Sequence, residues 1–229
     1  MMQVAIAVAS AFFASIALAA AVPAESSAGS PAAPPMIVNV TAGDDVSPSL
    51  AARILAETDA IWRGGGVSFV WRRAPRVVVP YARASETGPY VPNNLRVVIG
   101  DSVGTGGVGK RPLGWIVFND GTHPEQEVYL SHANALALME EARGVVGLMA
   151  DMPVAQRETL LGRAMGRALA HELGHYLLAS KEHTARGLMK AVLTAAELFA
   201  TDTASFRIDP AQRRAVAARL LGEPVVASR

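Results

Sequence analysis

The chain contains no cysteine among its 229 residues. Disulfide bonds are therefore excluded, and so is every thiol mechanism, whether catalytic, regulatory or metal-binding. Core packing, together with any bound metal, must stabilise the chain unaided. Apolar residues make up 51% of the sequence, which is enough for a chain of this length to bury a full core.

The chain also lacks an excess of charge of either sign. Its 21 Lys and Arg residues are matched by 20 Asp and Glu residues, which leaves a formal net charge of +1. We therefore expect no polybasic surface of the kind that binds nucleic acid or acidic membranes. The sequence has no internal repeat, and its length favours a single domain.

Residues 1–22 form an alanine-rich apolar run without a charged side chain. Small residues crowd its end at Ala21-Val22-Pro23-Ala24, which is typical of a secretory signal peptide. We therefore predict a signal peptide over residues 1–24, a flexible Ser, Ala, Gly and Pro-rich linker over 25–35, and a secreted or periplasmic protein. Because the run lacks a basic start and is nearly long enough to span a bilayer, an uncleaved N-terminal membrane anchor is the alternative.

From Met36 onward, strand and helix patterns alternate, which predicts one α/β (α+β) domain over residues 36–229. Ser47 and Pro48 have the chemistry of an N-cap and a first helical position, and we expect their helix to reach about Trp62. The expected strands are 36–41, 67–72, 95–100, 115–119 and 127–131, and the further expected helices are 133–143, 154–179, 195–200 and one capped by Asp209.

The clearest chemical pattern, His171-Glu172-Leu173-Gly174-His175, lies inside the longest expected helix. Residues four apart lie one turn apart, so both imidazoles project from one face and can share one zinc ion. The carboxylate of Glu172 can reach a water on that ion without binding the ion itself, as a general base must. The pattern predicts a hydrolytic site with one catalytic Zn²⁺.

A catalytic zinc ion usually takes three protein ligands and a water, so a third donor is needed. His183, eight residues beyond His175, is the leading candidate. Glu197 is the competing candidate, because a following helix could return its carboxylate to the metal as in thermolysin-like enzymes. The choice between the two donors changes the family but not the reaction class.

Together with His183 and Gly187-Leu188-Met189, the motif resembles that of the metzincin metallopeptidases, the matrixins most closely. The family pattern is HExxHxxGxxH followed by a tight turn with a methionine beneath the zinc, and Met189 would be that methionine. This chain has Leu178 at the glycine position and Lys181 at the third histidine position, so its own pattern is HExxHxxxxxxxH. Because a left-handed conformation is costly for leucine, we expect a less sharp turn and a longer route to His183.

The resemblance implies a zincin-like fold, with a twisted mixed sheet, an active-site helix and a small helical C-terminal subdomain from about residue 180. It also implies a zinc-dependent endopeptidase whose peptide substrate pairs with an edge strand. We place this substrate-side strand at Trp115, Ile116, Val117, Phe118 and Asn119. A gluzincin-like peptidase that uses Glu197 is one alternative. A catalytically inactive, zinc-stabilised binding or structural module on the same scaffold is the other.

Two glycine patterns indicate structural rather than catalytic roles. Residues Gly104 to Lys110 have the GxxxxGK spacing of a phosphate-binding loop. Arg111 and Pro112 follow in place of Ser or Thr, and the next expected element is a strand rather than a helix, so we predict a surface loop. Gly162 and Gly166 each cost a helix about 1 kcal/mol relative to alanine, which indicates close backbone packing.

Overall fold

A computed structural model of the chain describes residues 34–75, 95–101, 112–119 and 123–222. The expected signal peptide, the glycine-rich loop at 104–110 and residues 25–33 of the expected linker lie outside the described residues. Within the described ranges, no helix combines the length and the apolar character needed to cross a bilayer.

Five strands form one mixed sheet in the order β2-β1-β3-β5-β4. Four of them run parallel to one another, and β4 lies antiparallel to β5 at one edge. The strands are β1 (Met36–Ala42), β2 (Phe69–Arg73), β3 (Leu95–Ile99), β4 (Gly114–Asn119) and β5 (His123–Leu130).

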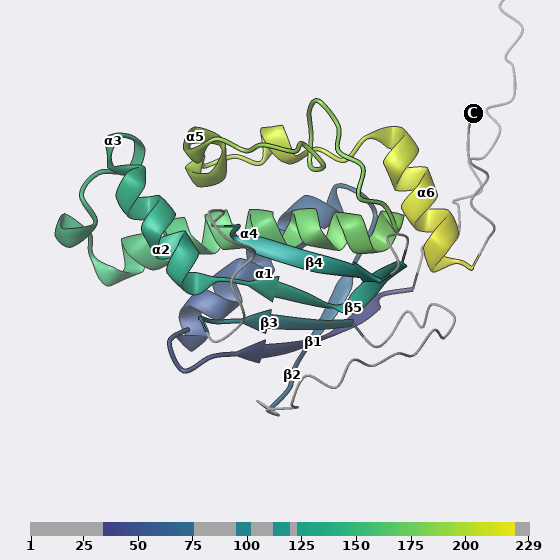
Figure 1. Cartoon of the computed structure of the whole chain (residues 1–229), viewed down its shortest axis with the longest axis horizontal. Helices are drawn as coiled ribbons and strands as arrows, with labels where there is room; N and C mark the ends of the chain where they lie inside the picture. Colours follow the sequence, from purple (N-terminus) through teal and green to yellow (C-terminus); the bar gives the residue numbers. More distant parts are fainter. Residues whose placement is uncertain (1–33, 76–94, 102–111, 120–122, 223–229) are drawn as a thin grey trace, which may run out of the picture. The chain divides into compact units, whose positions relative to one another are not determined.

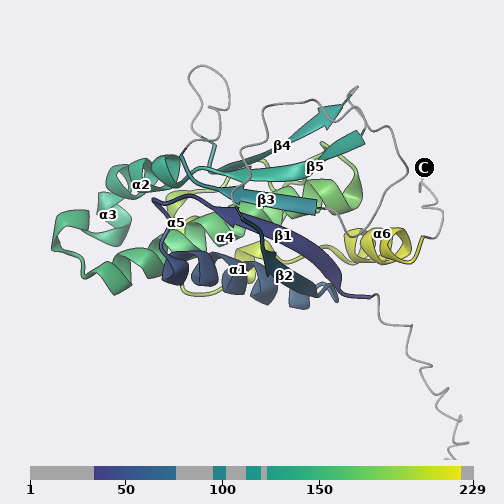
Figure 2. The same cartoon turned by 90° about the horizontal axis from the view of Figure 1, so that it is seen from below.

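Two long helices lie side by side against one face of this sheet (Figures 1 and 2). The first is α1 (Pro48–Arg63), and its N-cap is Ser47, whose hydroxyl accepts a hydrogen bond from the N–H of Leu50. The second is α4 (Val154–Leu178), which packs against β4 and β5. The shorter elements are α2 (His132–Glu141), α3 (Arg143–Val146), η1 (Met149–Asp151), α5 (Ala195–Phe199), η2 (Ala204–Phe206) and α6 (Pro210–Leu220).

Close contact between α1 and α4 depends on two glycines of α4. A Cβ built at Gly162 or at Gly166 would lie 2.6 Å from the nearest atom of α1. The indole N–H of Trp62, a residue only 1% exposed, donates to the carbonyl of Ala170 at 3.1 Å. The prediction that these glycines serve backbone packing is confirmed, and the contact fixes the half of α4 that carries the chemical motif.

The expected elements match the structure to within a few residues, with two exceptions. β5 begins at His123 rather than at 127, because its polar first half pairs with β4 through Asn119 and His123. The short helices α3, η1 and η2 were not expected as separate elements, although the first residue of α3, Arg143, is the last residue of the helix expected over 133–143. The mixed sheet packed against helices confirms the α/β (α+β) prediction.

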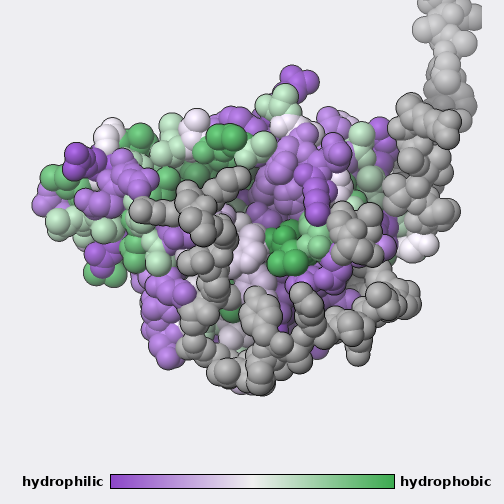
Figure 3. All heavy atoms as spheres, viewed as in Figure 1, coloured by the Kyte–Doolittle hydropathy of each residue, from purple (hydrophilic) through white to green (hydrophobic). Residues whose placement is uncertain are grey.

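On the face drawn in Figure 3, apolar side chains gather near α5 and hydrophilic ones gather beside them, over the region between α5 and α6.

Candidate metal centre

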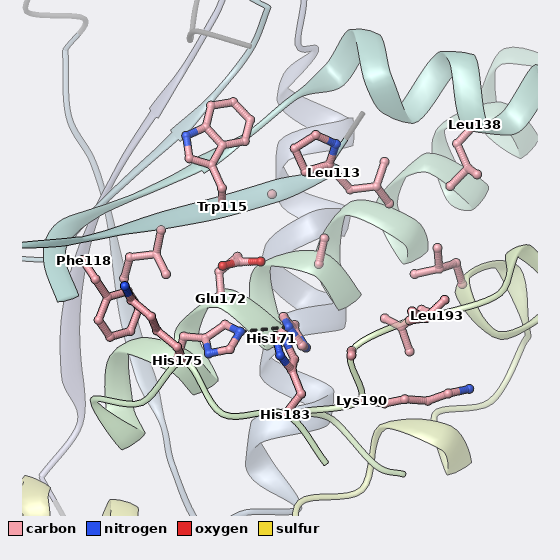
Figure 4. A pocket seen from close by; sticks show the side chains of 18 residues that line it. Leu113, Trp115, Phe118, Leu138, His171, Glu172, His175, His183, Lys190 and Leu193 are labelled. Carbon is pink, nitrogen blue, oxygen red and sulfur yellow. Dashed lines mark hydrogen bonds between the residues drawn. The ribbon is translucent and has the colours of Figure 1, made fainter. Parts of the chain in front are cut away.

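Three histidines meet at the C-terminal half of α4. His171 and His175 project from the helix, and His183 comes from the loop that follows it (Figure 4). Each ring offers one nitrogen to the cluster, and these three nitrogens all lie within 4.8 Å of one another. The ring centroid of His183 is 5.4 Å from that of His171 and 4.9 Å from that of His175. The structure therefore brings together the three residues that the sequence suggested as ligands.

A main-chain carbonyl orients each of the two helical imidazoles. The Nδ1 atom of His171 lies 2.8 Å from the carbonyl oxygen of Leu188, and the Nδ1 atom of His175 lies 2.7 Å from that of Ser180. A carbonyl can only accept, so each Nδ1 carries the proton and each Nε2 presents a lone pair. Metal-binding histidines typically have this arrangement, because the bond fixes both the tautomer and the ring direction.

The two free ring nitrogens are spaced as a shared ion requires. The Nε2 atoms of His171 and His175 lie 3.1 Å apart, and two nitrogens bound to one tetrahedral zinc ion lie about 3.3 Å apart. Burial lowers the pKa of His171 to about 4 and also lowers the pKa of His175. Both rings are therefore neutral near pH 7, which is the state that binds a metal, and the donor set fits zinc.

Glu172 lies between β4 and the histidines (Figure 4). A Cβ built at Gly114 would lie 3.2 Å from the Cγ of Glu172, so the glycine lets β4 pass close to this side chain. Burial raises the pKa of Glu172 to about 8, although a hydrogen bond from the backbone of Ile116 acts in the opposite direction. A carboxyl group in such a position can hold and release a proton near neutral pH.

A tight turn after the helix places a methionine against α4, beside the residue that precedes His175. Gly187 has a φ of 80°, and a Cβ there would lie 2.5 Å from the carbonyl oxygen of Arg207, which also accepts a hydrogen bond from the N–H of Leu188. Met189 is 1% exposed and packs against Gly174, where a Cβ would lie 2.2 Å from the methionine sulfur. A glycine at position 174 is thus what allows Met189 to approach α4.

The end of α4 corrects one sequence expectation. The helix closes with the N–H of Ser180 donating to the carbonyl of His175 at 3.2 Å and that of Ala179 to Tyr176 at 3.2 Å, which is a Schellman motif. Ala179 adopts the left-handed conformation, with φ 48° and ψ 43°. The expectation of a less sharp turn is wrong, because the left-handed position falls one residue after Leu178, on an alanine, at a cost of about 1 kcal/mol.

Glu197 is not part of the histidine cluster. Its carboxylate accepts hydrogen bonds from Nζ of Lys190 at 2.7 and 3.0 Å, and from the N–H and hydroxyl of Thr194 at 2.8 and 2.9 Å. The hydrogen bond from Lys190, and to a smaller extent those from Thr194, lower the pKa of Glu197 to about 2. Thr194 and Glu197 form the capping box of α5. Their three-residue spacing is visible in the sequence, and it indicates a helix-capping role for Glu197 rather than metal binding.

A cavity of about 660 Å³ opens beside the histidines. The β4 residues Gly114, Trp115, Ile116 and Phe118 line it, whereas Val117 and Asn119 do not. The ring of Trp115 points away from the histidines in Figure 4 and stacks on Tyr129. The cavity also has an apolar part, lined by Leu113, Leu138, Ala168, Ala191, Val192, Leu193 and Leu198.

No protein-family model matches this sequence, and no curated protein matches it. Among solved structures, the chain is similar in backbone arrangement to the archaemetzincin of Methanopyrus kandleri, with a TM-score of 0.44 and 14% sequence identity. The match covers 82% of this chain and 97% of that chain. A TM-score of this size does not place the chain in a family.

Proposed function

We propose that this chain is a zinc-dependent endopeptidase in which His171, His175 and His183 bind the metal and Glu172 is the general base. The observation that supports this most directly is the convergence of three ring nitrogens, two of them aimed by main-chain carbonyls. Such second bonds are what metal-binding imidazoles need and what an ordinary surface histidine does not require.

In the proposed reaction, the zinc ion and Glu172 have different roles. A bound zinc ion supplies a Lewis acid that polarises a peptide carbonyl and lowers the pKa of water. Glu172 takes a proton from the attacking water and delivers it to the leaving amine. Strand β4 passes close to Glu172 and leaves its side chain half-buried, and this burial raises the pKa of its carboxyl group.

The position of β4 supports a peptide as the substrate. Within the described part of the chain, β4 pairs with β5 alone, so its outer edge can bind an extended peptide as a further strand. Trp115, Ile116 and Phe118 of the proposed substrate-side strand line the cavity. A peptide along this edge would cross the cavity in front of Glu172 and the histidines.

Glu172→Gln tests this function, because it removes the base and keeps the shape of the side chain. We expect the full chain to bind one zinc ion per molecule, and the variant to keep that zinc and its melting temperature. Hydrolysis of a mixed peptide library should fall by about 10² to 10⁴-fold, the usual contribution of a general base.

His171→Ala is the control for metal binding and should lose the zinc. A purified native chain without zinc, or a Glu172→Gln variant that cleaves peptides at the native rate, would contradict the proposal. Stoichiometric zinc without any peptide hydrolysis in the native chain would instead favour the inactive zinc-stabilised module.

We also propose that the protein acts outside the cytoplasm, as a secreted or periplasmic enzyme. The support is the alanine-rich apolar run over residues 1–22 with small residues at its end. N-terminal sequencing of the chain recovered outside the cytoplasm should give a start near Val22 or Glu25. A start at Met1 would indicate the membrane anchor instead.

A further inference from the structure

Two lysines line the cavity, and they differ in their partners. Nζ of Lys190 lies 2.7 Å from a carboxylate oxygen of Glu197, in an ion pair. Nζ of Lys181 lies over the ring of Phe118, 5.1 Å from its centroid. Among the described residues, no carboxylate forms an ion pair with Lys181.

Lys181 is next to the candidate metal centre. Phe118, whose face it covers, meets the ring of His175 edge-on, with the centroids 6.4 Å apart. His183 follows two residues after Lys181 in the same exposed loop. An ammonium group on an aromatic face still has N–H donors on its other side, so Lys181 can keep this contact and bind a carboxylate.

The charges that line the cavity favour an incoming anion. Besides the histidines, they are Glu172, Lys181 and Lys190. Glu197 neutralises Lys190, and Glu172 is half-buried beside Gly114 of β4. Lys181 is thus the lining cation that has no acidic partner within the described residues.

The two ends of the cavity differ in character. Leu113, Leu138 and Leu193 lie at the end away from Phe118, with the histidines between (Figure 4). Figure 3 shows a similar division at the surface, with apolar side chains near α5 and hydrophilic ones beside them. A peptide along β4 therefore meets an apolar wall on one side of the histidines and Lys181 on the other.

We propose that Lys181 selects peptides that carry a carboxylate on the Phe118 side of the scissile bond. The inference deepens the proposed endopeptidase function and rests on it for the position of that bond, whereas the binding preference itself needs no hydrolysis. An Asp or Glu side chain and a peptide C-terminus offer the same carboxylate chemistry.

The test uses the full chain and a set of matched peptides. One parent peptide carries Glu or Gln at each position in turn, with a free or an amidated C-terminus. We expect the native chain to bind one Glu peptide about three- to fivefold more tightly than its Gln twin, and this ratio to shrink at high salt. A response to amidation alone would identify the C-terminus as the source of the carboxylate.

Substitutions at Lys181 should change this ratio in a graded way. Lys181→Met should bring the ratio to about one, Lys181→Arg should keep it, and Lys181→Glu should shift the preference to a lysine peptide. Arg186→Met is the matched control, because it removes a cation from the same exposed loop at a residue that does not line the cavity. Its ratio should equal that of the native chain.

The outcomes separate the two proposals. An unchanged ratio in Lys181→Met, or an equal loss in Arg186→Met, overturns the role of Lys181. Cleavage without any carboxylate preference rejects Lys181 and keeps the endopeptidase. A carboxylate preference in binding, lost in Lys181→Met and accompanied by no cleavage, keeps Lys181 as a binding residue and rejects the endopeptidase.

Discussion

The helical part and the loop part of the candidate metal centre are built differently. His171 and His175 lie on a helix packed against α1 and the sheet, and a main-chain carbonyl orients each ring. His183 lies on an exposed loop, and within the described residues no hydrogen bond orients its ring. The helix thus supplies a preformed pair of donors, and the loop supplies a donor whose ring is free to adjust.

The loop is nevertheless fixed where it returns to the helix. Thr184 donates its N–H to the carbonyl of Met189 at 2.8 Å, and Met189 is buried against Gly174. The rigid part of the centre therefore includes Met189, and the adjustable part is confined to the exposed residues before it. Four substitutions test this division.

The largest effect should come from the ligands themselves. We expect His175→Ala to weaken zinc binding by more than about 100-fold, because even a lost partner behind a ligand costs 10- to 100-fold. His183→Ala should cost less, since the oriented pair remains. Competition with a chromophoric chelator measures both affinities. An equal loss in the two variants would show that the orientation of the helical pair gives no advantage.

Gly174→Ala should have the next largest effect, on the rigid part. The new methyl group would meet the sulfur of Met189, and we expect the free energy of unfolding to fall by about 1–3 kcal/mol as the core shifts. Gly144→Ala in α3 is the control, because a Cβ there has no atom within 4 Å. Chemical denaturation compares the two, and similar losses in both would remove the special role of the methionine contact.

Ala179→Gly should have the smallest effect and the opposite sign. Glycine adopts the left-handed conformation freely, so we expect the free energy of unfolding to rise by about 0.5–1 kcal/mol with unchanged zinc affinity. Ala142→Gly is the control, because Ala142 caps α2 with a φ of −85° and should lose stability. A loss in both variants would mean that the turn imposes no strain.

Local signals predicted the local parts of this molecule. Ser47 and Pro48 begin α1 as their chemistry indicates, and the two histidines four residues apart share one face of α4. The capping-box spacing of Thr194 and Glu197 was also present in the sequence, and it accounts for the position of that carboxylate away from the histidines.

Other features depend on strand order and could not be predicted from spacing. The approach of Gly114 to Glu172 requires β4 to lie antiparallel to β5 at the edge of the sheet. The contact between Lys181 and Phe118 depends on the same placement. The left-handed Ala179 escaped prediction for another reason, because side-chain chemistry at an alanine gives no sign of a left-handed turn.

Two hydrogen bonds connect α4 to the segment before α6. Arg207 accepts a hydrogen bond from Leu188, and the carbonyl of Leu188 in turn accepts one from the ring of His171. A chain cut short ahead of Arg207 would keep every histidine of the cluster and Glu172, yet it would lose the brace behind one imidazole. The smallest unit that keeps the histidine cluster fully braced therefore extends well past the motif, and it includes residues that have no chemistry of their own.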